Sequence, residues 1–181
     1  MSGVVSDGVR LWAGGWWIGD LDVFRDAPST LTRSRVDALC HTAAIRIDRD
    51  VLRSWAMRDL SVQRMLHHVL TDRLAVQEMV YGVDQRSTLA RVAELIQYLG
   101  RRADTASFPP MPRDETVVHG PTQKDLADAL GLSLASVEKS MSILRKHEVL
   151  ASSGKGRANR SYAILAPDML LAASLGHPLA A

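Results

Sequence analysis

The segment 153–160 carries three cations and no acid, a net charge of +3. The cations are Lys155, Arg157 and Arg160. Two short apolar runs flank the segment, at 149–152 and 161–165, and we expect them to pair as the strands of a hairpin. Because Lys and Arg neutralise phosphate groups, a hairpin with a cationic loop suits contact with the backbone of a nucleic acid.

Two helices are predicted just before this hairpin, at 123–130 and from 134 to about 147. Thr122 precedes the first helix and has an acid three residues later, which is the pattern of a capping box. Gly131 can take the left-handed conformation that ends a helix, and Ser133 can cap the second helix. The apolar residues fit two helices that cross steeply: Leu126, Ala127, Leu130, Leu132, Val137, Met141 and Leu144. Together these features predict a helix-turn-helix with the hairpin as its wing.

A long helix is predicted over 52–83, where only Gly82 interrupts the pattern. One apolar stripe follows spacings of three and four residues: Val62, Met65, Val69, Val76, Met79 and Val83. A second stripe lies beside it: Leu66, Leu70 and Leu74. A helix with two apolar stripes needs two surfaces to pack on, its own domain and something else. We assign the first stripe to a dimer interface with a second copy, and the alternative is a purely intramolecular core.

The N-terminal region 1–51 holds three of the four tryptophans and a balanced charge, with six Arg against seven Asp. The alternating run 43–47 indicates a strand. Trp12, Trp16 and Trp17 are expected in a core or an interface, with a ligand pocket as the alternative. Beyond the long helix, Asp84 can cap another helix that runs to about 102, and a proline-rich loop with a short strand at 116–119 follows.

No catalytic, cofactor or metal site is predicted. Cys40 is the only cysteine, which excludes a disulfide framework and cysteine-rich metal sites. In a strand, Cys40 and its neighbour His41 would point to opposite faces. His67 and His68 are adjacent on a helix and diverge by about 100°. His147 begins a run similar to a zinc-protease motif, but an alanine stands where the second histidine belongs. We therefore expect that the chain is not an enzyme.

Composition places the chain among ordinary globular proteins of one or two small domains. It has 181 residues and a formal net charge of +2, which is too small to indicate a partner by itself. No apolar run reaches the roughly 18 residues of a membrane span. The N-terminus does not have the pattern of a signal peptide. A single cysteine fits a reducing compartment, so we expect a cytoplasmic location and no membrane partner.

From about Leu11 to Leu165 the chain resembles the cyclic-AMP receptor protein/Fnr (Crp/Fnr) family of bacterial transcription regulators. The motif TQKDLADALGLSLASVEKSMSILRKHEVL is similar to the DNA-binding helices of that family. The stretches AGGWWIGDLDVF and VDALCHTAAIRIDRDVL resemble the end of its β-barrel and the strands before its long helix. The resemblance implies an α+β fold of four parts. These are a partial, truncated β-barrel at 1–51, a dimerisation helix at 52–83, a winged helix-turn-helix at 84–166 and a tail at 167–181.

The chain departs from the family pattern in the region that would bind a cyclic nucleotide. The family's barrel begins upstream of the residues given, so the resemblance leads us to expect only about half of it. Asp20 follows Gly19 where the family has a glutamate, and the arginine position of the family's phosphate clamp falls on Thr32. Arg33 and Arg35 come just after it. A clamp for a cyclic phosphate needs a carboxylate and a bidentate arginine, so we expect no cyclic-nucleotide gating and no cofactor.

The resemblance implies a homodimeric, sequence-specific DNA-binding transcription regulator. The family's base-reading positions fall on Leu134, Ala135 and Lys139, and Ser136 and Ser140 lie on the same helix. The complete predicted DNA-binding set is Thr122, Lys124, Ser133, Leu134, Ala135, Ser136, Lys139, Ser140, Lys155, Arg157 and Arg160.

The expected partners are double-stranded DNA with a pseudo-palindromic operator and a second copy of the chain, with RNA polymerase as a further candidate. The half-sites of such an operator lie about 34 Å apart. Two alternatives stay open at this stage. One is an adaptor that dimerises without binding DNA, and the other is a regulator gated by a small molecule that is not a nucleotide.

Overall fold

The chain combines two small open sheets with helices that differ greatly in length. The computed structural model describes residues 4–19, 23–24, 35–82, 86–105, 116–152 and 160–179. In chain order the elements are β1 (Val5–Ser6), β2 (Leu11–Trp12), β3 (Asp37–Ala38), α1 (Arg49–Arg58), α2 (Leu60–Tyr81), α3 (Thr88–Thr105), β4 (Thr116–His119), α4 (Gln123–Leu130), α5 (Leu134–Lys146), β5 (Leu150–Ser152), β6 (Ser161–Ile164) and α6 (Pro167–Ser174). The expected α+β class is confirmed. The described N-terminal strands form an open sheet rather than a closed barrel.

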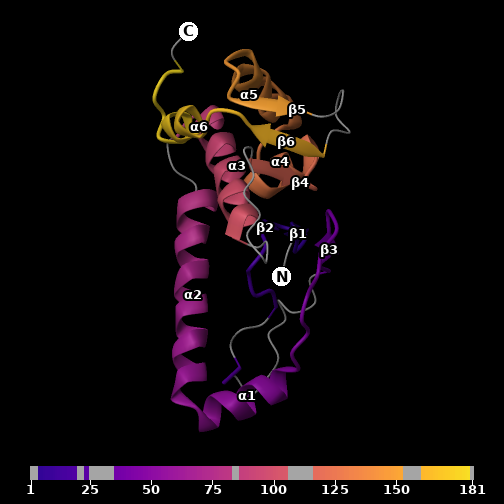
Figure 1. The fold of residues 1–181 in the computed structure, drawn as a ribbon, viewed down its shortest axis with the longest axis vertical. Helices are drawn as coiled ribbons and strands as arrows, with labels where there is room; N and C mark the ends of the chain where they lie inside the picture. Colours follow the sequence, from indigo (N-terminus) through magenta and orange to yellow (C-terminus); the bar gives the residue numbers. More distant parts are fainter. Residues whose placement is uncertain are drawn as a thin grey trace.

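Figure 1 shows α2 as a rod, with α1 across its lower end and the N-terminal strands beside it. The helices α4 and α5 and the second sheet lie at the opposite end of the molecule from α1. Among the described residues, no helix is both long enough and apolar enough to cross a membrane.

The single helix predicted over 52–83 is divided at Asp59. Asp59 has extended backbone angles, φ −131° and ψ 113°, so the helix cannot pass through it. Its N–H donates to the carbonyl of Trp55 at 2.9 Å and ends α1. Its carboxylate accepts a hydrogen bond of 2.7 Å from the N–H of Ser61 and caps α2. The prediction of one continuous helix was wrong because Asp59 satisfies backbone groups of two helices at once.

The strand predicted at 43–47 is also absent, apart from an isolated bridge residue at Ala43. Ile45 is 88% exposed, so the alternation of that run does not mark a buried face. A strand needs a neighbour to accept and donate its hydrogen bonds, and sequence alternation alone does not supply one.

The C-terminal sheet has the order β4-β6-β5, and both pairs of neighbours are antiparallel. Tyr162 stands at the centre of the sheet, opposite Val118 on one side and Ser152 on the other. The strands predicted at 116–119 and around 150 and 161 are therefore confirmed, and the segment expected as a C-terminal tail begins with the helix α6 at Pro167. The cap predicted at Asp84 lies outside the described residues.

The N-terminal sheet shares one hydrophobic core with the helices of the C-terminal half. Trp12 is fully buried, and its ring lies 5.8 Å from that of Trp16, measured between centroids. The ring of Trp16 lies 6.3 Å from that of Tyr98 on α3. The Tyr81 hydroxyl, at the end of α2, accepts a hydrogen bond from Leu11 N–H at 3.1 Å and donates to the Leu11 carbonyl at 2.5 Å. Trp12 and Trp16 are thus core residues, and one tyrosine fastens β2 to α2.

Gly120, which follows β4, brings three parts of the chain together. Its N–H donates to the carbonyl of Arg160 at 2.8 Å, next to the start of β6. A Cβ at this position would lie 3.1 Å from the Cβ of Leu39, and the backbone has a φ of +114°. A side chain here would therefore be strained and would meet the segment after β3. The close approach fixes the base of the predicted wing against the N-terminal region.

Candidate nucleic-acid interface

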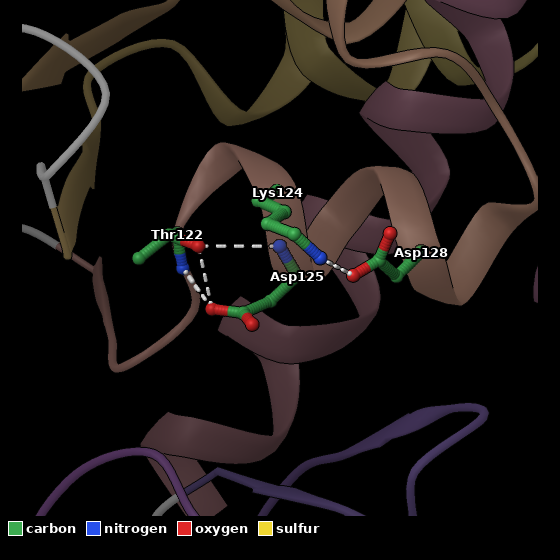
Figure 2. A network of polar contacts seen from close by, with 4 residues as sticks. All are labelled: Thr122, Lys124, Asp125 and Asp128. Carbon is green, nitrogen blue, oxygen red and sulfur yellow. Dashed lines mark hydrogen bonds and ion pairs between the residues drawn. The ribbon is translucent and has the colours of Figure 1, made fainter.

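The first helix of the helix-turn-helix, α4, begins with a complete capping box (Figure 2). The Thr122 hydroxyl accepts a hydrogen bond from the Asp125 N–H at 3.2 Å. The Asp125 carboxylate accepts hydrogen bonds from the Thr122 N–H and hydroxyl, both at 2.7 Å. These bonds satisfy backbone donors that the first turn of a helix leaves without partners, so the start of α4 is fixed locally. The predicted cap is confirmed.

The turn between the two helices is equally well defined. Gly131 has φ 62° and ψ 36°, the left-handed conformation predicted for it. The Leu132 N–H then donates to the carbonyl of Ala127 at 2.9 Å. The Ser133 hydroxyl accepts from the Ser136 N–H at 3.2 Å and lies 2.8 Å from the Ser136 hydroxyl. Each feature is local in sequence, and together they set the angle at which α5 leaves α4.

The helix α5 has one buried face and one exposed face. The buried side chains are Val137, Ser140, Met141 and Leu144. The exposed residues follow spacings of four, three and four and form one line along the helix: Ala135, Lys139, Ser142 and Lys146. Lys139 makes no hydrogen bond or ion pair with the described part of the chain. This line presents small side chains and cations to solvent, as a helix that enters a DNA groove requires.

The structure corrects the prediction for Ser140. This residue is only 3% exposed, and its hydroxyl donates to the carbonyl of Ser136 at 3.0 Å. A base edge cannot reach a hydroxyl on the buried face of the helix. Leu134 and Ser136 are half-buried and flank the exposed line, whereas Ala135 belongs to it.

Sequence reasoning missed Ser142 and Lys146, which share the exposed line with Lys139. The signal was present in their spacing, since residues three and seven positions after Lys139 lie on the same face of a helix. The positions on α5 that the family resemblance implies lie nearer the start of the helix, between Leu134 and Ser140.

The residues predicted to contact phosphates differ in whether their polar groups already have a partner within the chain. Thr122 and Ser133 use their hydroxyls in caps, as described above. The Lys124 ammonium forms an ion pair with the Asp128 carboxylate one turn later, and the hydrogen bond from Lys124 raises the pKa of its ammonium (Figure 2). Arg160 is exposed and lies just before β6. Lys155 and Arg157 lie outside the described residues.

The helix α3 holds α4 in place from behind. The Arg91 guanidinium donates to the carbonyl of Leu130, the last residue of α4, at 2.7 Å. This bond satisfies one of the carbonyls that a helix leaves open at its C-terminus.

Behind α5, Tyr162 is fully buried in the sheet, and burial raises its pKa to about 12.

The stripe predicted as a dimer interface is divided by the fold. Met65 and Met79 are 37% and 46% exposed on α2. Val62 and Val69 are half-buried, Val83 lies outside the described residues, and Val76 is 7% exposed in the chain's own core. From the second stripe, Leu70 and Leu74 are 39% and 61% exposed, whereas Leu66 is buried. Val76 therefore offers no surface to a partner, and the exposed apolar side chains flank the buried face of α2 on both sides.

Other candidate chemistry finds no supporting arrangement in the described ranges. No group of three His, Cys, Asp or Glu side chains there could hold a metal ion. The Cys40 sulfur accepts a hydrogen bond from the Val4 N–H at 3.1 Å. Of the residues compared with a cyclic-nucleotide clamp, Asp20, Thr32 and Arg33 lie outside the described residues. Arg35 forms an exposed ion pair of 2.6 Å with Asp37.

Comparison with known proteins gives a match to a domain family and similarities to solved structures. Residues 90–173 match the family model of the Crp-like helix-turn-helix domain. The structure of FixK2 from Bradyrhizobium japonicum superposes with a TM-score of 0.57 and 22% identity, over 75% of this chain and 61% of FixK2. Reduced CprK in the absence of any ligand gives a TM-score of 0.41 and 16% identity, over 69% of this chain and 56% of CprK.

No curated protein matches the chain. The chain spans less than two thirds of the length of FixK2, with which it shares a fold. The domain match confirms the resemblance that the motif at 122–150 predicted for the DNA-binding helices.

Proposed function

From the Crp-like helix-turn-helix domain at residues 90–173, we propose that the chain is a DNA-binding transcription regulator. We further propose that it recognises a specific operator sequence and binds it as a homodimer. The observation that carries the proposal is the exposed line on α5. This line stands clear of the core, and its N-terminal end is fixed by the cap at Ser133. A helix held in this way can enter the major groove with its first turns against base edges.

The residue types on α5 define what it can read. The Lys139 ammonium can donate to the O6 and N7 acceptors of guanine, and the Ala135 methyl group can contact the methyl group of thymine. Ser142 can donate or accept, and Lys146 at the far end of the line suits a phosphate. Half-buried Leu134 and Ser136 flank this surface. The helix carries three cations and one acid between 134 and 146, so its charge favours DNA.

Contacts to phosphates would hold the register on either side of α5. Arg160 is exposed at the end of the predicted wing, and Lys155 and Arg157 belong to the same cationic segment. Contacts of this kind add affinity without reading sequence.

A homodimer is supported by the apolar side chains that α2 leaves exposed. A second copy packed along α2 would cover Met65 and Met79 or, on the other flank, Leu70 and Leu74. Two copies would then present two α5 helices to half-sites about 34 Å apart. Sedimentation at several concentrations should give a dimer, and Leu74→Asp and Met79→Asp, made separately, show which flank is used. A monomer at every concentration would contradict this part of the proposal.

Gating by a cyclic nucleotide is not part of the proposed function. One cation that α2 brings to the N-terminal region is already engaged: the Arg73 guanidinium lies 4.8 Å from the Trp12 ring centroid and donates to the Gly19 carbonyl at 3.3 Å. With cyclic AMP we expect no rise in melting temperature, whereas a ligand that binds only the folded state would raise it.

The experiment that tests the function is selection of bound duplexes from a random pool with the purified chain. We expect enrichment of a pseudo-palindrome. Lys139→Ala should lower the preference for the selected site by about 1–3 kcal/mol. Arg160→Ala is the matched control, because loss of a phosphate contact should weaken all duplexes alike and reduce the salt slope by about one. Unchanged sequence preference in Lys139→Ala would contradict the assignment, and no enrichment at low salt would favour the adaptor alternative.

A further inference from the structure

The exposed lysine of α4, Lys124, already forms an ion pair with an acid of the same helix. Lys124 and Asp128 are 72% and 62% exposed and form an ion pair across one helical turn (Figure 2). We propose that Asp128 holds Lys124 away from phosphates in the free protein and thereby limits the affinity of the chain for DNA of any sequence. This inference rests on the proposed function, and it assigns to Asp128 a role that acts through Lys124.

The geometry makes Asp128 the acid that can restrain Lys124. Asp125 is the other acid on α4, but its carboxylate is turned to Thr122 and accepts two hydrogen bonds there. Figure 2 shows the Lys124 side chain running along the outside of the helix to Asp128, away from the capping box. The Lys124 ammonium therefore has a single close partner among the described residues.

The position of the pair gives it a consequence for DNA. In a helix-turn-helix the first helix crosses the DNA backbone while the second lies in the groove. The charged residues of α4 are one lysine and two aspartates, so this helix brings more negative than positive charge to the phosphates. Lys124 is the cation that α4 can offer, and a phosphate must displace Asp128 to bind it.

The two competing contacts are similar in strength. An exposed ion pair in water is weak, and so is one lysine–phosphate contact, which owes its favourable free energy to counterion release. Lys124 therefore has no strong preference between Asp128 and a phosphate. Removal of Asp128 should leave the phosphate as its partner. The Lys124 ammonium is charged at neutral pH with either partner, because its ordinary pKa of 10.5 is far above neutral and hydrogen bonding to Asp128 raises that pKa further. The exchange therefore involves no proton.

The test is a double-mutant cycle on binding to the selected operator and to a random duplex, at about 50 and about 200 mM salt. Asp128→Asn should tighten binding to both duplexes by roughly threefold to tenfold at the lower salt and should steepen the salt slope by about one, because one phosphate contact is gained. Lys124→Ala alone should change affinity by less than about twofold, because Lys124 is held by Asp128 in the free protein. The double variant should lose the gain of Asp128→Asn.

Asp50→Asn is the matched control. Asp50 is an exposed aspartate on α1, at the opposite end of the molecule, and its replacement changes the net charge equally. This variant should bind like the wild type. Thermal melting of Asp128→Asn checks that the helix stays intact.

Three results would overturn the inference. One is an equal gain from Asp128→Asn with and without Lys124, which would mean that only the charge of Asp128 matters. Another is a loss of affinity in Lys124→Ala as large as that expected for a full phosphate contact. The third, no binding of any duplex by the wild type or any variant, would overturn the proposed function together with this inference, and it is distinct from the other two.

Discussion

The helix-turn-helix and the N-terminal sheet are held together by opposite means. In α4 and α5, the N-terminal end is fixed by a side chain that bonds to a residue three positions away, as Thr122 does to Asp125 and Ser133 to Ser136. In the N-terminal sheet the strands are two residues long, and β2 is fixed by the hydroxyl of Tyr81, 70 positions later in the chain.

This contrast separates two sources of order. The helix-turn-helix is specified by local chemistry and needs the core only to bring its helices together. The N-terminal sheet has too few ladder hydrogen bonds to be stable alone and depends on buried aromatic side chains that belong to other elements.

Trp12→Ala should remove the main support of the N-terminal sheet. The side chain is fully buried between Trp16 and Tyr81, so its loss should lower the free energy of unfolding by about 3–5 kcal/mol. Urea denaturation followed by circular dichroism measures the change. Trp55→Ala is the control, because Trp55 is 50% exposed on α1 and should cost much less. Equal losses in the two variants would contradict the assignment of Trp12 to the core.

Tyr81→Phe should isolate the bond between α2 and β2. The ring remains, but the Leu11 N–H and carbonyl both lose their partner in a buried place, which should cost about 1–3 kcal/mol of stability. Hydrogen exchange of the Leu11 amide gives a second readout and should accelerate. An unchanged exchange rate at Leu11 would show that β2 does not need this anchor.

Alkaline pH should destabilise the fold through its buried tyrosines. Burial raises the pKa of Tyr81, and it raises the pKa of Tyr162 to about 12, above the ordinary value of 10.0. Each tyrosine keeps its proton to a higher pH in the folded state than in the unfolded chain. Its contribution to stability is therefore fully present below pH 10 and falls as pH rises above it. The slope should reach at most about 1.4 kcal/mol per pH unit for each tyrosine. Stability curves at increasing pH should be shallower for Tyr81→Phe, and the same slope in both proteins would exclude Tyr81 as a cause.

Thr122→Ala should produce the smallest change, about 1 kcal/mol, because it removes one side of a capping box at the surface of α4. Thr122→Ser keeps the hydroxyl and should remain close to the wild type in thermal melting. If the alanine variant were as destabilised as Trp12→Ala, the view that α4 depends only modestly on its cap would be wrong.

The parts of the fold that depend on neighbouring residues were predictable from the sequence. Thr122, Gly131 and Ser133 predicted both ends of α4 and the start of α5 within a residue or so, and the strands of the second sheet followed from short apolar runs. The break at Asp59 carried a local signal as well, an aspartate two residues before a serine, but the apolar periodicity on either side concealed it.

Other features depended on information that spacing does not contain. Periodicity shows that α2 has several apolar stripes, but only the packing of Trp12 and its neighbours decides that Val76 faces inward. Ser140 was misplaced for a related reason: a small polar residue fits a buried position when it bonds to a carbonyl one turn earlier. The aromatic cluster joins residues from β2, α2 and α3, whose proximity no local pattern announces.

The contact of Trp16 with Tyr98 has a practical consequence for protein engineering. A chimera that exchanges only the winged helix after residue 82 would replace Tyr98 and leave Trp16 without its aromatic partner. Grafting a different DNA specificity onto this scaffold should therefore be confined to the solvent side of α5, where Lys139 and Ser142 can be replaced without touching the seam between the two halves.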